Sequence, residues 1–168
     1  IGYTTITSEL NGIKSSATIF VPPGEDIEIW KITIKNKAAK TKRLSLVTYF
    51  EWCLGNSDDV HREFQKTFIT TWFDKDLNAL FGKKKKHLVP KYISTGMFEY
   101  PIAGFSSISE KPASYEGDKE RFYGMYRGLV NPIALENDTL TNSVGEWYDP
   151  ISSFQVNIDL KAGEEKVI

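Results

Sequence analysis

Apolar and polar residues alternate one by one along several segments of this chain, and this alternation restricts the fold more than any other feature. Phe154, Val156, Ile158 and Leu160 alternate with polar residues at 153, 155, 157 and 159. Successive side chains of a β-strand point to opposite faces, so a period of two predicts half-buried strands of antiparallel sheets. The pattern recurs at Ile13, Ala17, Ile19 and Val21, and at Leu44, Leu46, Phe50, Trp52 and Leu54.

The parity of the apolar positions changes once, within residues 27–34. Ile27 and Ile29 share one parity, whereas Trp30, Ile32 and Ile34 share the other. Such a change predicts either a β-bulge or a strand buried on both faces, and each alternative makes this strand central.

Turn sequences separate the alternating segments, and strands spaced about 8–12 residues apart are typical of a sandwich or barrel. We therefore expect an all-β fold of two antiparallel sheets, in a single domain spanning residues 1–168. Only residues 58–64 and 118–122 have the composition of a helical turn, and neither has the length of a stable helix. Residues 106–119, rich in Ser, Glu, Lys and Pro, are expected to form a long exposed loop.

Charge and composition exclude several classes of function. Lys and Arg total 21 against 22 Asp and Glu, so no net field draws the chain to nucleic acid or to an anionic membrane. The sequence has neither an apolar run of spanning length nor a signal peptide. A single cysteine, Cys53, excludes an internal disulfide and favours a reducing compartment such as the cytoplasm. The chain opens at Ile1 and stops at Ile168 as an apolar pattern resumes, so we expect a fragment of a longer polypeptide, truncated at both ends.

No complete active site can be recognised. His61, Arg62 and Glu63 follow Asp58 and Asp59, which suggests acid/base chemistry, but neighbours on a loop lack the fixed geometry that catalysis requires. A solvated turn or a structural ion pair is the favoured interpretation. The two histidines, 61 and 87, lie far apart in the sequence, so no metal site is predicted either.

The sharpest local feature is a basic run, Lys83, Lys84, Lys85, Lys86 and His87, which follows an expected strand that ends at 81–82. In a hairpin tip these cations would be solvated. The alternative is a contact with an anionic or hydroxyl-rich partner, such as a sugar or a neighbouring subunit.

Aromatic residues make up 13% of the chain, and aromatic rings stack well on the apolar faces of sugars. Phe50 and Trp52 share an apolar face and are assigned to the core. Other rings lie near turns or on polar parities, and they are candidate ligand contacts: Tyr49, Trp72, Tyr123, Tyr126, Trp147 and Tyr148.

The order of short motifs along nearly the whole chain resembles the N-terminal β-domain of the inverting glycoside phosphorylases, which include cellobiose, cellodextrin and chitobiose phosphorylases and cyclic β-glucan synthases. These motifs are Gly2-Tyr3-Thr4, Asn11-Gly12-Ile13-Lys14, Phe20-Val21-Pro22, Ile32-Thr33-Ile34-Lys35-Asn36, Glu51-Trp52-Cys53-Leu54, His61-Arg62-Glu63-Phe64, Arg121-Phe122-Tyr123-Gly124-Met125-Tyr126, Asn131-Pro132, Asn142-Ser143-Val144, Asp149-Pro150-Ile151 and Gly163-Glu164.

The resemblance implies a supersandwich similar to galactose mutarotase, followed in the intact enzyme by an (α/α)6 barrel. It implies that the barrel carries the general acid and binds inorganic phosphate, the co-substrate, so that this piece has no catalytic residue and no cofactor. It also implies that the domain supports a homodimer and lends one loop to the acceptor-sugar site. That loop aligns with Lys83–His87, where lysine replaces the family's arginine and cannot form a two-pronged contact. Tyr123 and Tyr126 are further candidates for sugar contact.

Two alternatives remain open. The chain could be an independent carbohydrate-binding module or lectin that uses Trp147, Tyr148 or residues 123–126 as a stacking platform. It could also be a structural domain with no affinity for glycans.

Overall fold

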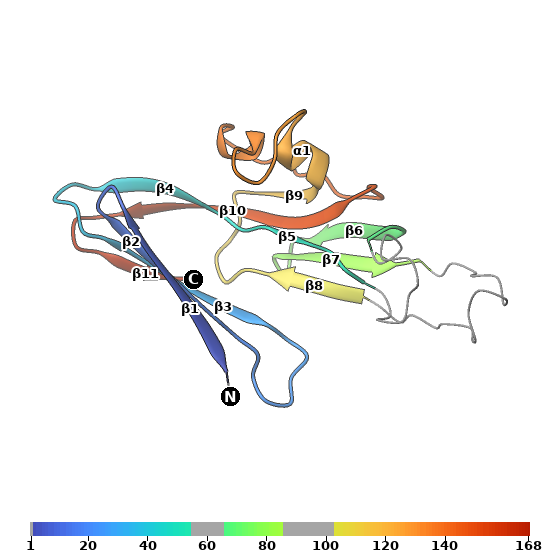
Figure 1. The fold of residues 1–168 in the computed structure, drawn as a ribbon, viewed down its shortest axis with the longest axis horizontal. Coiled ribbons are helices and arrows are strands. Elements are labelled where there is room, and N and C mark those ends of the chain that lie inside the picture. Colours follow the sequence, from blue (N-terminus) through green and yellow to red (C-terminus); the bar gives the residue numbers. More distant parts are fainter. Residues whose placement is uncertain (1, 55–65, 86–102) are drawn as a thin grey trace. The chain divides into compact units, whose positions relative to one another are not determined.

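The computed structural model describes residues 2–54, 66–85 and 103–168 (Figure 1). Its elements are β1 (Tyr3–Leu10), β2 (Ile13–Phe20), β3 (Ile29–Asn36), β4 (Lys42–Val47), β5 (Phe50–Glu51), β6 (Ile69–Asp74), β7 (Ala79–Lys84), β8 (Ala103–Ser107), β9 (Ser114–Asp118), helix α1 (Lys119–Tyr123), 3-10 helix η2 (Ile133–Leu135), β10 (Pro150–Leu160) and β11 (Glu165–Val167). Neighbouring strands pair antiparallel, which confirms the predicted all-β fold of antiparallel sheets. The chain divides into two compact units, residues 1–45 with 157–168, and residues 46–156.

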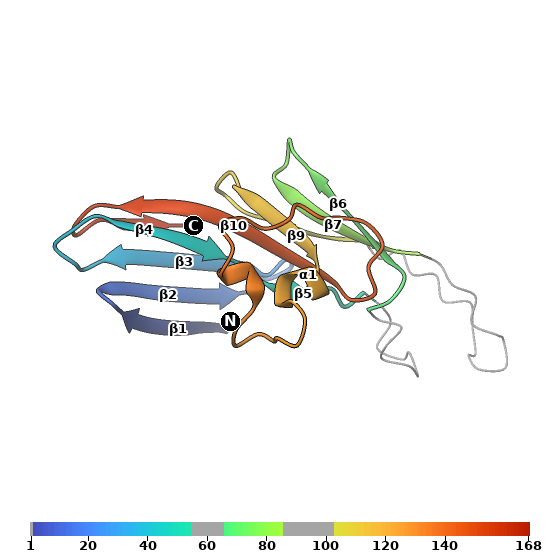
Figure 2. The same ribbon diagram turned by 90° about the horizontal axis from the view of Figure 1, so that it is seen from above.

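The first unit contains a four-stranded sheet in the order β1-β2-β3-β11, and Figure 2 shows β1, β2 and β3 side by side. A two-residue turn joins β1 to β2. Asn11 and Gly12 both have positive φ, at 50° and 76°, which is the conformation of the tight hairpin turn that Asn-Gly favours. The register then runs without interruption from Leu10 opposite Ile13 to Tyr3 opposite Phe20.

Neither explanation for the change of parity at Trp30 is correct. The pairing of β2 with β3 is continuous, so there is no bulge. Ile29 and Trp30 are both exposed, so this end of β3 is not buried on either face. The Trp30 indole N–H donates to Glu28 Oε1 at 2.5 Å, which satisfies its polar atom at the surface. The central position of β3 is confirmed, because it pairs with β2 on one side and with β11 on the other.

A buried amide fastens the end of β3 to the chain that follows β10. Asn36 is fully buried, and its Nδ2 donates to Lys40 O at 2.8 Å and to Leu160 O and Lys161 O at 3.0 Å. Its Oδ1 accepts from Ala38 N at 2.9 Å. Every polar group of this side chain therefore has a partner, as a buried amide requires.

The second unit contains the sheet β6-β7-β8, and β9 and β5 pair with β10 (Figure 1). Trp52 packs on two glycines of the β6-β7-β8 sheet. An added Cβ at Gly82 or at Gly104 would lie 3.0 Å from the Trp52 ring. The ring is buried, and its N–H donates to Ile151 O at 3.0 Å. Trp52 is thus core, as predicted.

The expectation of a long exposed loop at residues 106–119 is wrong. This segment includes the end of β8 and the whole of β9, where Ser114, Glu116 and Asp118 are buried. The polar composition has a different cause, because β9 pairs with a stretch of β10 that is itself polar and buried. Ser114 Oγ donates to Gln155 Oε1 at 2.7 Å across this pair.

The short helix expected at residues 118–122 is confirmed as α1, one residue further along. The second candidate helix, at 58–64, lies outside the described residues.

Replacing Gly82 with alanine should destabilise the second unit. The new methyl group would press on the Trp52 ring, which is held by its own hydrogen bond, and overpacking of this kind costs about 1–3 kcal/mol. Urea unfolding followed by tryptophan fluorescence measures the change. Gly128→Ala is the matched control, because nothing lies within 4 Å of its added Cβ. Equal midpoints for the two variants would contradict this account of the core.

Candidate functional site

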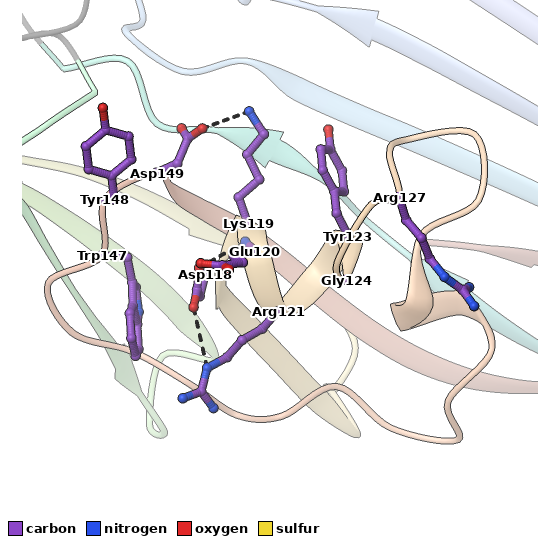
Figure 3. A pocket seen from close by; sticks show the side chains of 10 residues that line it. All are labelled: Asp118, Lys119, Glu120, Arg121, Tyr123, Gly124, Arg127, Trp147, Tyr148 and Asp149. Atoms are coloured by element: carbon purple, nitrogen blue, oxygen red, sulfur yellow. Dashed lines mark hydrogen bonds and ion pairs between the residues drawn. The ribbon is translucent and has the colours of Figure 1, made fainter.

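A surface pocket lies beside α1, within the second unit (Figure 3). Its volume is about 790 Å³, within the usual range for ligand sites. Two segments line it, residues 118–127 around α1 and residues 147–149 before β10. The lining residues are Asp118, Lys119, Glu120, Arg121, Tyr123, Gly124, Arg127, Trp147, Tyr148 and Asp149.

The sequence sets both ends of α1. Asp118 precedes the helix in an extended conformation, and its Oδ1 accepts from Glu120 N at 3.0 Å, as an N-cap does. Gly124 ends the helix with φ at 79°, and its N–H donates to Glu120 O at 2.8 Å. Phe122 is buried with Leu140 and Ile151, which holds the helix against the unit.

Two carboxylates and two ammonium groups form a charge cluster beside the pocket: Glu51, Lys66, Lys119 and Asp149. Lys119 Nζ lies 3.0 Å from Glu51 Oε1 and 2.9 Å from Asp149 Oδ2. Lys66 Nζ contacts Glu51 Oε2 and lies 4.0 Å from Asp149 Oδ1. The two ammonium groups thus bridge the same two carboxylates, and Figure 3 shows Lys119 reaching Asp149.

The cluster shifts the pKa values of its members. Burial acts to raise the pKa of Glu51, but hydrogen bonds from Lys66, Lys119 and Tyr49 outweigh it and lower this pKa to about 2. Burial acts to lower the pKa of Lys119, and its bonds to Asp149 and Glu51 reverse the effect and raise it. Burial and hydrogen bonds to Tyr123 and Glu51 raise the pKa of Tyr49 far above its ordinary value. These shifts keep Glu51 and Lys119 charged and Tyr49 neutral near pH 7.

Aromatic rings surround these charges. Tyr123 stacks on Tyr49 with ring centroids 5.7 Å apart, and Lys119 Nζ lies 5.6 Å from the centroid of the Tyr123 ring. The Arg121 guanidinium lies 5.2 Å from the Trp147 ring. Tyr148 is 89% exposed at the rim. The pocket therefore combines paired charges with aromatic surface, which suits a neutral ligand rich in hydroxyl groups.

A buried carboxylate holds the two lining segments in place. Glu116 is almost fully buried on β9 and accepts from the N–H groups of Gly117 and Asp118 at 3.0 and 3.1 Å. It also accepts from the Thr141 hydroxyl at 2.5 Å and from the Ser143 hydroxyl. Glu116 thereby ties residues 141–143 to β9, and this segment leads directly to Trp147.

Lys83 and Lys84 do not lie at the solvated hairpin tip that we predicted for the basic run. Strand β7 continues to Lys84, with Lys83 opposite Thr70 and Lys84 opposite Ile69. The alternation of the strand turns Lys84 to the inner face, where it is only 2% exposed, whereas Lys83 is exposed. Lys85 contacts Glu146.

The structure places three of the described candidate residues, Tyr123, Trp147 and Tyr148, in the lining of the pocket. Tyr126, in contrast, lies on the turn after α1, is 99% exposed and has a left-handed φ of 59°. The lysines of β7 are not among its lining residues. Lys86, His87 and the acid/base candidates at 58, 59 and 61–63 lie outside the described residues.

Sequence reasoning missed the charge cluster and Glu116. Glu51 occupies the polar parity of an expected strand, and Asp149-Pro150 reads as an ordinary turn, so neither position indicates an ion pair. Glu116 stands in a segment whose composition resembles a solvated loop. The N-cap pattern of Asp118 before residues 119–122 was the available signal for α1.

Two further findings concern the described residues alone. They contain no group of three or more His, Cys, Asp or Glu that could hold a metal ion. No helix among them is long and apolar enough to cross a membrane.

Comparison with known proteins yields a family model and several relatives. The model for the glycosyl hydrolase 94 supersandwich domain matches residues 1–168. The N,N'-diacetylchitobiose phosphorylase of Vibrio proteolyticus is 30% identical over 98% of this chain and 20% of its own length. The 3-O-beta-D-glucopyranosyl-beta-D-glucuronide phosphorylase of Paenibacillus borealis is 27% identical over 99% of this chain and 20% of its own. The cyclic beta-(1,2)-glucan synthase of Rhizobium meliloti is 23% identical over 100% of this chain and 6% of its own length. The chain thus spans about one fifth of the phosphorylases it matches.

The charge cluster should make stability depend on pH in the acid range. The pKa of Glu51 falls from 4.5 to about 2 on folding, so its contribution is complete above pH 4.5 and is lost as the pH falls toward 2. Glu51→Gln removes this contribution. When the pH is lowered from about 5 to about 3, the free energy of unfolding of the variant should therefore fall less than that of the unmodified chain. Urea titrations at each pH provide the measurement.

The matched control is Glu25→Gln, because Glu25 is exposed and makes no ion pair within the described residues. It should keep the original pH dependence. If the free energy of unfolding of Glu51→Gln fell as steeply with decreasing pH as that of the unmodified chain, the cluster would not be what holds Glu51 ionised.

Proposed function

Because this chain belongs to the glycosyl hydrolase 94 family, as its supersandwich domain, we propose that it is the non-catalytic β-domain of an inverting phosphorylase of β-glucosides. The observation that carries the proposal is the match over all 168 residues together with the coverage of only one fifth of the relatives. In the intact enzyme, a helical (α/α)6 domain would transfer the glycosyl group to inorganic phosphate. The β-domain would support the homodimer and contact the acceptor sugar.

The state of the pocket charges supports a non-catalytic role. A general acid must carry a proton near neutral pH, whereas ion pairs hold Glu51 in its charged form. Asp118 is the pocket carboxyl whose pKa is raised, chiefly by burial, and it is occupied as the cap of α1. A protonated Asp118 would weaken that cap, so acid catalysis there would compete with the fold.

The cations of the pocket also favour a neutral ligand over phosphate. Lys119 contacts Asp149, Arg121 Nε lies 3.4 Å from Asp118 Oδ2, and Arg127 Nη1 lies 2.5 Å from Glu136 Oε1. Phosphate binding calls for cations that are free to form charge-assisted bonds. A sugar hydroxyl both donates and accepts, so it can bond to either partner of an existing ion pair.

Acceptor contact is proposed for the side of the unit that carries α1. Tyr123 lines the pocket, and Tyr126 and Tyr148 expose most of their rings. The basic run is the second candidate. Its support is weaker, because Lys84 is buried and Lys85 already contacts Glu146, which leaves Lys83 as the exposed lysine of β7.

An independent carbohydrate-binding module is the alternative function. The exposed ring of Tyr148 beside Trp147 favours it, because such a platform could bind sugar without a catalytic domain. Titration of the 168-residue chain with cellobiose, followed by tryptophan fluorescence, separates the two functions. Saturation in the low millimolar range or below would support the module.

The proposed division of roles between the non-catalytic β-domain and a separate catalytic domain can be tested directly. The intact polypeptide should release sugar 1-phosphate from a β-linked disaccharide and phosphate, and the 168-residue chain should release none. Release by the chain alone would reject the non-catalytic role. An intact polypeptide that is inactive on a panel of β-glucosides would reject the phosphorylase assignment.

In the intact enzyme, Tyr126→Ala and Tyr148→Ala should each raise the KM for the acceptor sugar in the synthetic direction by about 2- to 13-fold, with little change in kcat. The loss of one stacked ring, about 0.5–1.5 kcal/mol, corresponds to that factor. Leu77→Ala is the matched control, because it removes an apolar side chain that is 61% exposed from the β6–β7 turn. Unchanged acceptor KM values in both tyrosine variants would reject the proposed contact.

A further inference from the structure

The charges that line the pocket beside α1 do not balance (Figure 3). Each lysine and arginine of the lining contacts a carboxylate: Lys119 pairs with Asp149, Arg121 with Asp118, and Arg127 with Glu136. Glu120, an exposed residue of α1, also lines the pocket, but it has no ion pair within the described residues. The lining that the structure describes thus offers a carboxylate, but no cation, that is free of a partner.

A second carboxylate lies next to this end of the pocket. Glu116 is 1% exposed, and the groups that donate to it among the described residues are neutral N–H and hydroxyl groups. The pKa of Asp118, which stands between Glu116 and Glu120 in the sequence, responds to both. Burial raises this pKa, the hydrogen bond from Glu120 N and the charge of Arg121 lower it, and the charges of Glu116 and Glu120 add to the increase. The Asp118 end of the pocket therefore has a negative potential.

Aromatic stacking does not distinguish sugars by charge. The rings of Tyr123, Trp147 and Tyr148 line the pocket, and they can stack on the apolar face of any pyranose. Selection by charge must therefore come from the ionised side chains. The relatives include a phosphorylase named for a glucuronide, so membership of the family does not decide whether the acceptor sugar is charged.

We propose that Glu120 is a specificity-determining residue of the acceptor site: the pocket binds a neutral sugar or an amino sugar and excludes sugars that carry a carboxylate. Two like charges about 4 Å apart in water weaken binding about fivefold, and two opposite charges strengthen it by the same factor. An ammonium group is thus favoured over a carboxylate about 25-fold, with a neutral hydroxyl between them. The inference rests on the acceptor contact of the proposed function and adds the class of sugar.

The other carboxylates of the lining are less suited to this role, because they already have partners. Asp118 caps α1 and pairs with Arg121, and Asp149 pairs with Lys119. The ammonium group of a ligand would have to displace these partners. Glu120 is exposed and unpaired within the described residues, so its carboxylate can meet a ligand without weakening the fold.

Isothermal titration calorimetry of the intact polypeptide tests the inference without turnover. The probes are glucosamine, glucose and glucuronic acid, titrated one at a time at about pH 6.5, where the amine is protonated and the carboxyl group is ionised. Glucosamine should bind about 25-fold more tightly than glucuronate, and the affinity for glucose should lie between the two.

Glu120→Gln should bring the three affinities together. The loss of the carboxylate should weaken the binding of glucosamine about fivefold, strengthen that of glucuronate about fivefold and leave that of glucose nearly unchanged. Glu25→Gln is the matched control, because it removes an exposed carboxylate that lies outside the lining and has no ion pair within the described residues. It should keep the original order of affinities.

A second measurement needs no variant. Raising the NaCl concentration from about 20 mM to about 500 mM should narrow the ratio of glucosamine to glucuronate affinity in the unmodified polypeptide, because salt screens exposed charges. The affinity for glucose should stay nearly constant, since a neutral sugar has no charge to be screened.

Equal or tighter binding of glucuronate by the unmodified polypeptide would overturn the inference. So would a ratio that neither Glu120→Gln nor salt changes, an equal change in Glu25→Gln, or the absence of saturable binding of all three sugars. Release of sugar 1-phosphate from β-linked disaccharides is measured separately and does not depend on these ratios. Failure of the inference is therefore distinguishable from failure of the proposed function.

Discussion

Burial of both faces of β10 is the constraint on which the second unit depends. Phe154 and Val156 occupy one face, and Ser153 and Gln155 the other, yet all four are buried. On the polar face, the Gln155 amide is satisfied: its Oε1 accepts from Ser114 Oγ and from Leu140 N, and its Nε2 donates to Asp138 O at 3.0 Å. The buried Ser153 hydroxyl has no hydrogen-bond partner among the described residues. Burial of the Gln155 amide without its partners would cost about 1–3 kcal/mol for each unmet group. This requirement draws residues 114–118 and 138–140 onto the strand.

The pocket follows from that arrangement. Once β9 lies on β10, Asp118 stands at the point where α1 begins, and Glu116 binds the hydroxyls of Thr141 and Ser143. The two lining segments, far apart in sequence, are thereby fixed to one strand. Lys119 can then bridge Glu51 and Asp149. Because the charges of this cluster are already paired with one another, the cluster offers polar groups to a ligand but carries no net charge.

Sequence reasoning succeeded where one face of a strand meets the core and the other does not. Ile158 and Leu160 are buried while Asn157 and Asp159 are exposed, as the alternation predicts. It failed where burial is two-sided or where an apolar side chain is exposed. Period-two alternation cannot distinguish a solvated serine from one covered by another segment. Composition has the same limit, and it led us to place residues 106–119 in a loop and Lys83 and Lys84 at a hairpin tip.

The sequence by itself determined the strands with alternating apolar residues, the Asn11-Gly12 turn, the position of the short helix α1 and, through the order of its motifs, the family. These signals are local or are carried by short segments that need no knowledge of their neighbours. Only the tertiary structure decided that Glu51, Lys66, Lys119 and Asp149 form one charge cluster and that Lys84 is buried. The reason is physical: an ion pair, the burial of a charge and the neighbours of a strand depend on contacts between distant parts of the chain, and the identity of a residue does not specify what lies opposite it.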